Sequence, residues 1–121
     1  MRRGAARSPR SGFTILELLT VVVILVVLAG IAITRYQASK RRAYVAVMLS
    51  DLRLLAMAAE SRFILENTYV GAEVPAGSAG VSLVFDGTPS WWIASATHAS
   101  LPGFSCTIRS GGDADAVPVC R

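Results

Sequence analysis

The first half of the chain contains one long apolar run. From Phe13 to Ile33 only Thr14, Glu17 and Thr20 are polar, and the last 13 residues of the run have no polar side chain. Its 21 residues would rise about 30 Å as a helix, the thickness of the hydrocarbon core of a bilayer. The run therefore predicts one membrane-spanning helix.

A removable secretory signal peptide is the alternative for this run, since such peptides also begin with basic residues. Its apolar region would be shorter, and a small-x-small cleavage site would follow it. Ala29, Gly30 and Ala32 come close to such a site. Removal of the whole segment therefore stays a secondary hypothesis.

The helix is expected to continue well past the apolar run. From Phe13 to about Asn67 there is no proline, and Gly30 is the only glycine. Residues 34–67 show two apolar stripes with steps of three and four residues. A helix buried on one side needs a single stripe, so two stripes predict two partners, one of them the C-terminal part of the chain. The first stripe comprises Val45, Leu49, Leu52, Ala56, Ala59 and Phe63, and the second comprises Val47, Leu54, Ala58 and Leu65.

Residues 68–121, here called the head, have a different composition, with Gly, Pro, Ser and short β-prone runs. Three or four short antiparallel strands beside a helix predict an α+β fold. Because about 55 residues bury little apolar surface alone, we expect the head to pack on the helix. The expected strands are Val81–Phe85, Ser90–His98, Phe104–Arg109 and Val117–Arg121, with a loop at Tyr69–Gly80 and turns at 86–89 and 110–115.

Positive charge gathers on both sides of the apolar run. Residues 1–12 contain four arginines and no acid, and the whole chain has a formal charge of +4, so the remainder is neutral. A general nucleic-acid-binding role thereby loses its main support. Four basic residues also follow the run, so the positive-inside rule does not decide the orientation. This basic cluster comprises Arg35, Lys40, Arg41 and Arg42.

The two cysteines, Cys106 and Cys120, lie in the last 16 residues and far from any histidine. Metal binding is therefore disfavoured, and a disulfide formed in an oxidising compartment is the simpler account. Such a bond places the head outside the cytoplasm. It would stabilise the head by about 3 kcal/mol for a loop of this length.

No set of residues indicates catalysis, a metal or a cofactor. His98, the sole histidine, lies in an expected strand without a cysteine or carboxylate at ligand spacing, which favours a structural or surface role. Asp113 and Asp115 match half of a calcium loop but lack its further oxygen ligands. No serine lies in a nucleophile motif, so we expect no enzymatic activity. Of the adjacent Trp91 and Trp92, one should face the core and the other solvent.

Glu17 is an acid inside the apolar run, where it costs about 2.5–3.5 kcal/mol on insertion scales. Either it lies near enough to the end of the span to reach water, or a positive group meets it at the same depth. Cleavage between Gly12 and Phe13 would create such a group, the α-amino group of Phe13. Pairing on a neighbouring helix would fix the axial register, because any other stagger leaves both charges unpaired.

The N-terminus resembles the prepilin cleavage and methylation signature of type IV pilins and pseudopilins. Its sequence is Gly12-Phe13-Thr14-Ile15-Leu16-Glu17, and the apolar run ends with Ala29-Gly30-Ile31-Ala32-Ile33. The resemblance implies cleavage after Gly12 by prepilin peptidase, a membrane aspartic peptidase. It also implies N-methylation of Phe13 and assembly into a helical filament in which Glu17 is the assembly carboxylate.

The same resemblance implies the type IV pilin fold, and Cys106–Cys120 resembles the C-terminal disulfide loop common in pilins. The chain departs from the family pattern at Thr34. Many members have a proline there, associated with a helix break or melted segment in assembled pili. Without that proline Gly30 is the only obvious weak point, so we do not transfer the melted segment to this chain.

These features predict four segments: a cleaved leader (1–12), a transmembrane and assembly helix (13–33), the amphipathic half of that helix (34–67) and a β-sheet head (68–121). By resemblance the chain is a type IV pilus subunit with no cofactor. It waits in the inner membrane as a single-pass precursor, then joins copies of itself in an extracellular filament through an assembly platform and motor. The alternatives are a pseudopilin of a type II secretion system and a minor pilin for adhesion or DNA uptake. Nucleic acid is a partner only in the last case.

Overall fold

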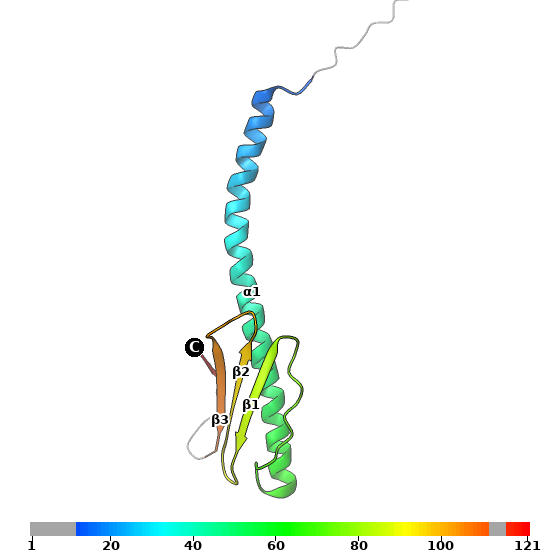
Figure 1. Ribbon diagram of the computed structural model, residues 1–121, viewed down its shortest axis with the longest axis vertical. Helices are drawn as coiled ribbons and strands as arrows, with labels where there is room; N and C mark the ends of the chain where they lie inside the picture. The colour runs from blue at the N-terminus through cyan, green and yellow to red at the C-terminus, as the bar shows by residue number, and fades with distance from the viewer. Residues whose placement is uncertain (1–11, 112–115) are drawn as a thin grey trace, which may run out of the picture. The chain divides into compact units, whose positions relative to one another are not determined.

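The computed structural model describes residues 12–111 and 116–121. They form one helix and a four-stranded antiparallel sheet whose strand order follows the chain, β1-β2-β3-β4 (Figure 1). The α+β fold is therefore confirmed, and it is pilin-like. The elements are α1 (Ile15–Glu66), β1 (Val81–Gly87), β2 (Trp92–His98), β3 (Ser105–Ser110) and β4 (Val119–Cys120).

The chain divides into two compact units within α1. The first unit ends at Gln37, and the second comprises Ala38–Arg121. In the first unit every described residue is exposed. The apolar part of α1 is at least 18 residues long, and none of it is buried within the chain. By length and composition α1 can therefore cross a membrane, and its apolar side chains find no partner among the described residues.

The observed helix is slightly shorter than the expected range of Phe13 to Asn67. At its C-terminal end, the Asn67 N–H still donates to the Phe63 carbonyl oxygen at 2.8 Å. Asn67 itself has a φ of 55°, the left-handed conformation that often follows the last helical residue. The helix therefore ends at Glu66, and the chain turns towards the head.

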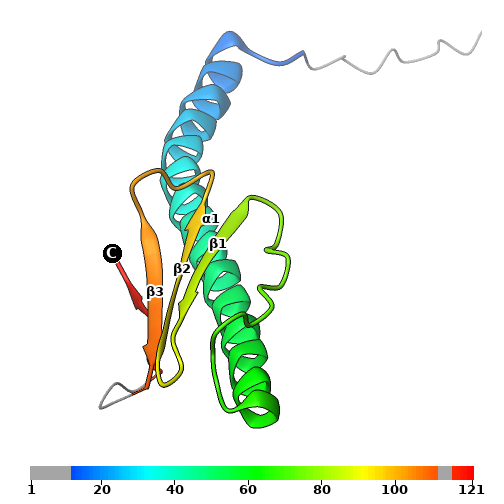
Figure 2. The ribbon, with the colours of Figure 1, turned by 60° about the horizontal axis from the view of Figure 1, so that its bottom comes forward.

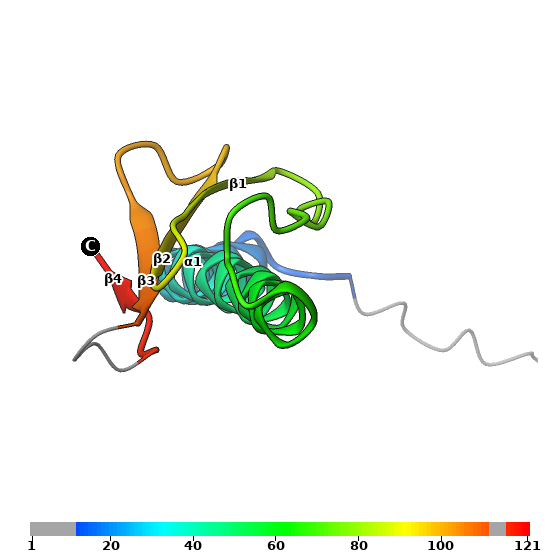
Figure 3. The same cartoon turned by 90° about the horizontal axis from the view of Figure 1, so that it is seen from below.

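The core of the second unit lies between α1 and the inner face of the sheet (Figure 2). Seen from below, strands β1 to β3 all lie on one side of α1 (Figure 3). Every member of the first apolar stripe is buried or packs against this core, so the predicted contact with the head is confirmed. The stripe omitted two helix residues that are fully buried, Met48 and Leu55. The buried apolar residues are Met48, Leu52, Leu55, Ala59, Tyr69, Trp92, Ala94, Ala96, Cys106 and Ile108.

The two adjacent tryptophans face opposite sides of the chain, as expected. Trp92 is 0% exposed and lies in the core, while Trp91 is 45% exposed. Strand β2 begins at Trp92 rather than at Ser90 because Thr88 and Trp91 close the preceding turn. The Thr88 N–H donates to the Trp91 carbonyl oxygen at 2.8 Å, and the Trp91 N–H donates to Thr88 Oγ1 at 3.1 Å.

The other strand limits also differ from expectation. Strand β1 is longer and reaches Gly87, which pairs with Trp92. Strand β4 is only Val119–Cys120, much shorter than the expected strand at 117–121. The expected turn at 110–115 lies mostly outside the described residues, as do Asp113 and Asp115.

Two carboxylates of α1 accept hydrogen bonds from residues of the head. Asp51 is buried, and it accepts hydrogen bonds from the Ser78 N–H at 2.7 Å and the Ser78 hydroxyl at 2.8 Å. Glu60 accepts the Tyr69 hydroxyl at 3.2 Å and the Trp92 indole N–H at 3.2 Å. These bonds span up to 32 residues of sequence, so they fix the loop and β2 against the helix.

The only histidine has a structural environment, as expected. The His98 ring is buried and stacks on Tyr44 with 4.3 Å between ring centroids. Its Nδ1 accepts the Ser100 N–H at 3.0 Å. Among the described residues, no group of three or more possible metal ligands occurs.

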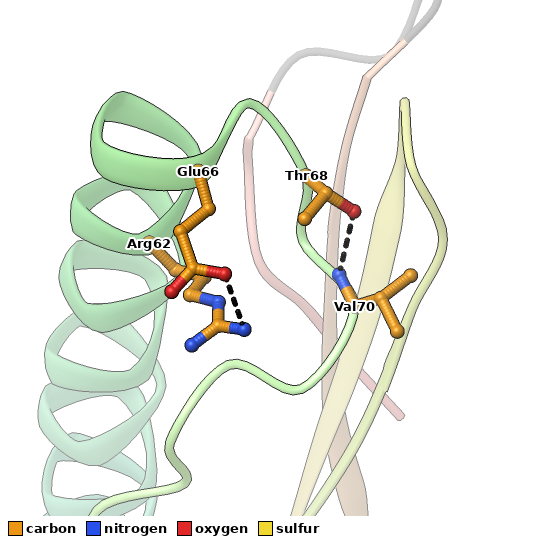
Figure 4. A network of polar contacts seen from close by, with 4 residues as sticks. All are labelled: Arg62, Glu66, Thr68 and Val70. Atoms are coloured by element: carbon orange, nitrogen blue, oxygen red, sulfur yellow. Dashed lines mark hydrogen bonds and ion pairs between the residues drawn. The ribbon is translucent and has the colours of Figure 1, made fainter.

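The last turn of α1 and the start of the following loop carry a small polar network (Figure 4). Arg62 Nη2 pairs with Glu66 Oε2 at 2.7 Å, one helical turn away. Beyond the helix, the Val70 N–H donates to Thr68 Oγ1 at 3.2 Å. The network stabilises the place where the chain leaves the helix for the head.

Candidate functional site

The first turn of α1 is closed by reciprocal hydrogen bonds between Thr14 and Glu17. Thr14 Oγ1 accepts the Glu17 N–H at 3.2 Å. In return, Glu17 Oε2 accepts the Thr14 N–H at 3.0 Å and the Thr14 hydroxyl at 3.2 Å. This is a capping box, which satisfies two backbone donors that a helix N-terminus leaves unpaired. It explains why α1 begins at Ile15 rather than at Phe13.

The capping box gives Glu17 a structural function that neither sequence hypothesis included. The signal was present, since a Thr-x-x-Glu spacing before an apolar run is the sequence pattern of such a cap. Both Thr14 bonds go to Oε2, and no described residue forms a hydrogen bond with Oε1. The carboxylate therefore keeps one oxygen for a further partner while it caps its own helix.

The remaining polar side chains of the apolar segment are satisfied by their own helix. The Thr20 hydroxyl donates to the Glu17 carbonyl oxygen at 2.8 Å. The hydroxyl of Thr34, which stands where many pilins have proline, donates to the Ile31 carbonyl oxygen at 2.9 Å. Neither threonine needs an outside partner, so Glu17 is the one described side chain in this segment with a free charged oxygen.

The expected scissile pair lies just before the capping box. Gly12 and Phe13 precede α1 in non-helical conformation, and both are exposed. A Cβ added at Gly12 would meet no atom within 4 Å. No contact of the described chain therefore requires a glycine there, and a demand for a small residue at this position would come from outside the subunit.

The second apolar stripe of α1 is only partly covered by the head. Leu54 is 50% exposed and Leu65 is 80% exposed, while Val47 and Ala58 are partly buried. Two further apolar residues of the same helix, Met57 and Ile64, are also exposed. A substantial apolar surface of the second unit is therefore left without a partner among the described residues.

The disulfide joins Cys106 and Cys120, which face each other across β3 and β4. The Ser105 N–H donates to the Arg121 carbonyl oxygen at 2.9 Å, and the Arg121 N–H donates back to Ser105 at 2.9 Å. Cys106 is fully buried, so the bond also attaches the C-terminal strand to the core.

Comparison with known protein families identifies one motif. The family model for the prokaryotic N-terminal methylation motif matches residues 7–33, which include Gly12, Phe13 and Glu17 and end with the apolar run. No curated protein and no solved structure matches the chain. The chain thus carries the methylation motif typical of type IV pilins and pseudopilins, on a pilin-like fold. Proteins of this kind are structural subunits rather than enzymes, and the motif implies prepilin peptidase processing and filament assembly.

Proposed function

We propose that this chain is a subunit of a type IV pilus filament, cut after Gly12, N-methylated on Phe13 and polymerised through α1. The observation that carries the proposal is the contrast between the two units of the chain. The second has a closed core and a disulfide. The first presents an entirely exposed apolar helix that begins with the methylation motif.

The capping box supports a role for Glu17 after cleavage. The new α-amino group would lie on Phe13, next to the N-cap residue and at the positive end of the helix macrodipole, where a positive charge is unfavourable. Glu17, in the first helical turn, is the nearest described carboxylate in the sequence. Its free Oε1 would pair with the α-amino group of Phe13 in its own or in a neighbouring subunit. The carboxylate and the ammonium group would then compensate each other in a medium of low dielectric constant.

The chemistry of the head supports its proposed location. Disulfides form and persist in oxidising compartments, so the Cys106–Cys120 bond favours a head outside the cytoplasm. The subunit would wait in the inner membrane as a single-pass protein with α1 across the bilayer. An assembly platform and motor would then extract it into the extracellular filament.

Intact-mass spectrometry of the protein recovered from the cell surface tests the processing step. We expect a chain that begins at Phe13 and carries one added methyl group. An N-terminus near Met1 would exclude cleavage, and one beyond Ala32 would show that the apolar run is a removable signal peptide.

The exposed stripe of α1 is proposed as the contact with neighbouring subunits, and Leu54→Asp tests it. The charge would be desolvated in a subunit interface but stays in water in the free subunit, so filaments should be lost while the second unit stays folded. Val84→Asp is the matched control, because Val84 is exposed on the outer face of β1. Normal filaments from Leu54→Asp would show that the stripe is not an assembly surface.

A pseudopilin of a type II secretion system is the second candidate, because the methylation motif is common to both classes. Sheared surface filaments distinguish the two. A pilus subunit forms the dominant protein of these filaments, whereas a pseudopilin is missing from them and its deletion blocks the release of secreted proteins. A minor pilin for adhesion or DNA uptake would occur in the filaments as a small fraction.

A further inference from the structure

The part of α1 that follows the apolar run carries an unbalanced positive charge. Between Glu17 and Asp51 the sequence has no acidic residue, and it contains the four residues of the basic cluster. Basic clusters next to a membrane span are attracted to anionic lipid headgroups. All four residues of the basic cluster are exposed, and none belongs to the buried core of the second unit.

Two arginines of the basic cluster have defined surroundings in the second unit. Arg41 is exposed, and its guanidinium lies 5.1 Å from the centroid of the Phe104 ring, which ties it to the head. Arg42 is exposed and forms no ion pair with any carboxylate of the described residues. Both charges are therefore available to an external anion, and one of them is held in place by an aromatic ring.

These arginines lie close in the sequence to the end of the apolar run. Arg41 and Arg42 follow Ile33 by eight and nine residues, within the roughly 15–20 residues beyond a span over which flanking charges act. Long arginine side chains near the end of a span reach the headgroup layer with their charged ends. Tyr36, an exposed aromatic residue of the type that gathers at membrane interfaces, lies between the run and these arginines.

We propose that Arg41 and Arg42 bind anionic phospholipid headgroups, such as phosphatidylglycerol, while the subunit waits in the membrane. The proposal rests on the proposed function in one respect, that α1 spans a bilayer with the head on the outer side. Loss of residues 1–12 removes the four positive charges of the leader. The basic cluster is then the main electrostatic contact of the mature subunit with the bilayer, and extraction into a filament must break it.

Duplex DNA is the competing partner for the same charges. Proteins that bind it strongly neutralise about 6–10 phosphates, whereas the basic cluster offers four charges. The chain after the leader is neutral as a whole, so its net charge adds nothing to the attraction for DNA. The proximity to the apolar run therefore favours the lipid.

The lipid selectivity of residues 13–121, the proposed mature chain, reconstituted in proteoliposomes tests the proposal. Trace spin-labelled phosphatidylglycerol or phosphatidylcholine is added to phosphatidylcholine vesicles, and electron paramagnetic resonance measures the fraction of each label immobilised by the protein. A basic residue close to an anionic surface changes partition by about fivefold. We expect a several-fold preference for phosphatidylglycerol, which falls towards one in R41Q/R42Q and in 1 M salt, since salt screens exposed charges.

Matched variants separate charge from fold. R53Q/R109Q removes two exposed arginines of the second unit outside the basic cluster and should retain the preference. R41K/R42K retains the charges and should also retain it. Because Arg41 contacts Phe104, Arg42→Gln alone provides a variant that disturbs no described contact, and it should lower the preference by part of the full effect.

Equal immobilisation of the two lipids, or a preference unchanged in R41Q/R42Q, would overturn the proposal. So would binding of a fluorescent DNA duplex that is lost in R41Q/R42Q while no lipid preference exists. The assay needs only membrane-inserted protein and no filament. A lipid preference in a chain that never assembles would therefore contradict the pilus function alone, and pili from a chain without the preference would contradict this inference alone.

Discussion

Glu17 and Thr14 cap the start of α1 together: Glu17 Oε2 accepts the Thr14 N–H at 3.0 Å, and Thr14 Oγ1 accepts the Glu17 N–H at 3.2 Å. The cap lies one residue after the peptide bond between Gly12 and Phe13, the proposed cleavage site within the methylation motif. Glu17 therefore contributes two separable properties, a hydrogen-bond acceptor for its own helix and a negative charge close to the proposed N-terminus of the mature subunit.

The capping box predicts that Thr14→Ala loosens the first turn of α1, because the Glu17 N–H loses Thr14 Oγ1 as its acceptor. Replacing an N-cap threonine costs about 1 kcal/mol, so amide hydrogen exchange at residues 15–18 should be faster in detergent micelles. Thr20→Ala is the control, because the Thr20 hydroxyl donates to the Glu17 carbonyl oxygen and caps no backbone N–H. Equal exchange in the two variants would show that the cap does not form in the micelle-bound chain.

The two tryptophans of the head provide a matched pair for stability. Trp92→Ala removes a fully buried side chain and its hydrogen bond to Glu60, so it should lower the free energy of unfolding by about 3–5 kcal/mol. Trp91→Ala removes a half-exposed ring and should cost within about 0.5 kcal/mol. Urea unfolding of the full chain in detergent, followed by near-UV circular dichroism, measures both. Similar losses would contradict the burial of Trp92.

Asp51 and Ser78 hold the long loop on the helix. Asp51→Ala removes both hydrogen bonds between the buried carboxylate and Ser78, so we expect a loss of about 1–3 kcal/mol in the free energy of unfolding. Asp51→Asn retains one acceptor and should lose less. Arg53→Ala, at an exposed position nearby in the sequence, should be close to neutral. If Asp51→Ala were as stable as Arg53→Ala, the loop would not depend on this contact.

The raised pKa of Tyr69 predicts that the stability of the head falls at alkaline pH. Burial, together with the charge of Glu60 and the hydrogen bond to it, raises the pKa of the Tyr69 hydroxyl above its ordinary value near 10. As the pH rises past 10 the unfolded chain loses this proton first, so the folded state binds more protons and its stability falls with pH. The contribution is fully present below pH 10.

Tyr69→Phe should remove this decline above pH 10 and lower stability at neutral pH, because the hydrogen bonds to Glu60 are lost. Tyr36→Phe, at an exposed tyrosine, should leave the decline unchanged. Unfolding in urea at several pH values between 8 and 11 gives both results. A decline that persists in Tyr69→Phe would assign it to another group.

The pattern of apolar residues predicted the helix and three of the strands closely because both depend on local periodicity. The capping box was predictable for the same reason, since Thr14 and Glu17 are three residues apart. The burial of Asp51 was not, because its partner Ser78 lies 27 residues away. Met48 and Leu55 were missed because the head covers a wider face of α1 than one stripe.

The last prediction separates the charge of Glu17 from its capping function. Glu17→Ala removes both, Glu17→Gln keeps an acceptor that a capping box can use and removes the charge, and Thr14→Ala removes the cap and keeps the charge. Both Glu17 variants should insert at least as well as the wild type, because an acid in the span costs about 2.5–3.5 kcal/mol. Cleavage after Gly12 should be largely retained, since the change lies outside the scissile pair.

Three pools decide the result when measured in one strain: precursor, mature membrane subunit and sheared filament. If Glu17 pairs with the Phe13 amine, both Glu17 variants accumulate mature subunit with little filament, because the amine stays unpaired in a medium of low dielectric constant. Thr14→Ala then still assembles. Filaments from Glu17→Gln but not from Glu17→Ala or Thr14→Ala would assign assembly to the cap rather than the charge. Normal filaments from both Glu17 variants would make Glu17 a tolerated acid at the membrane interface, and accumulation of precursor would instead assign it to recognition by the peptidase.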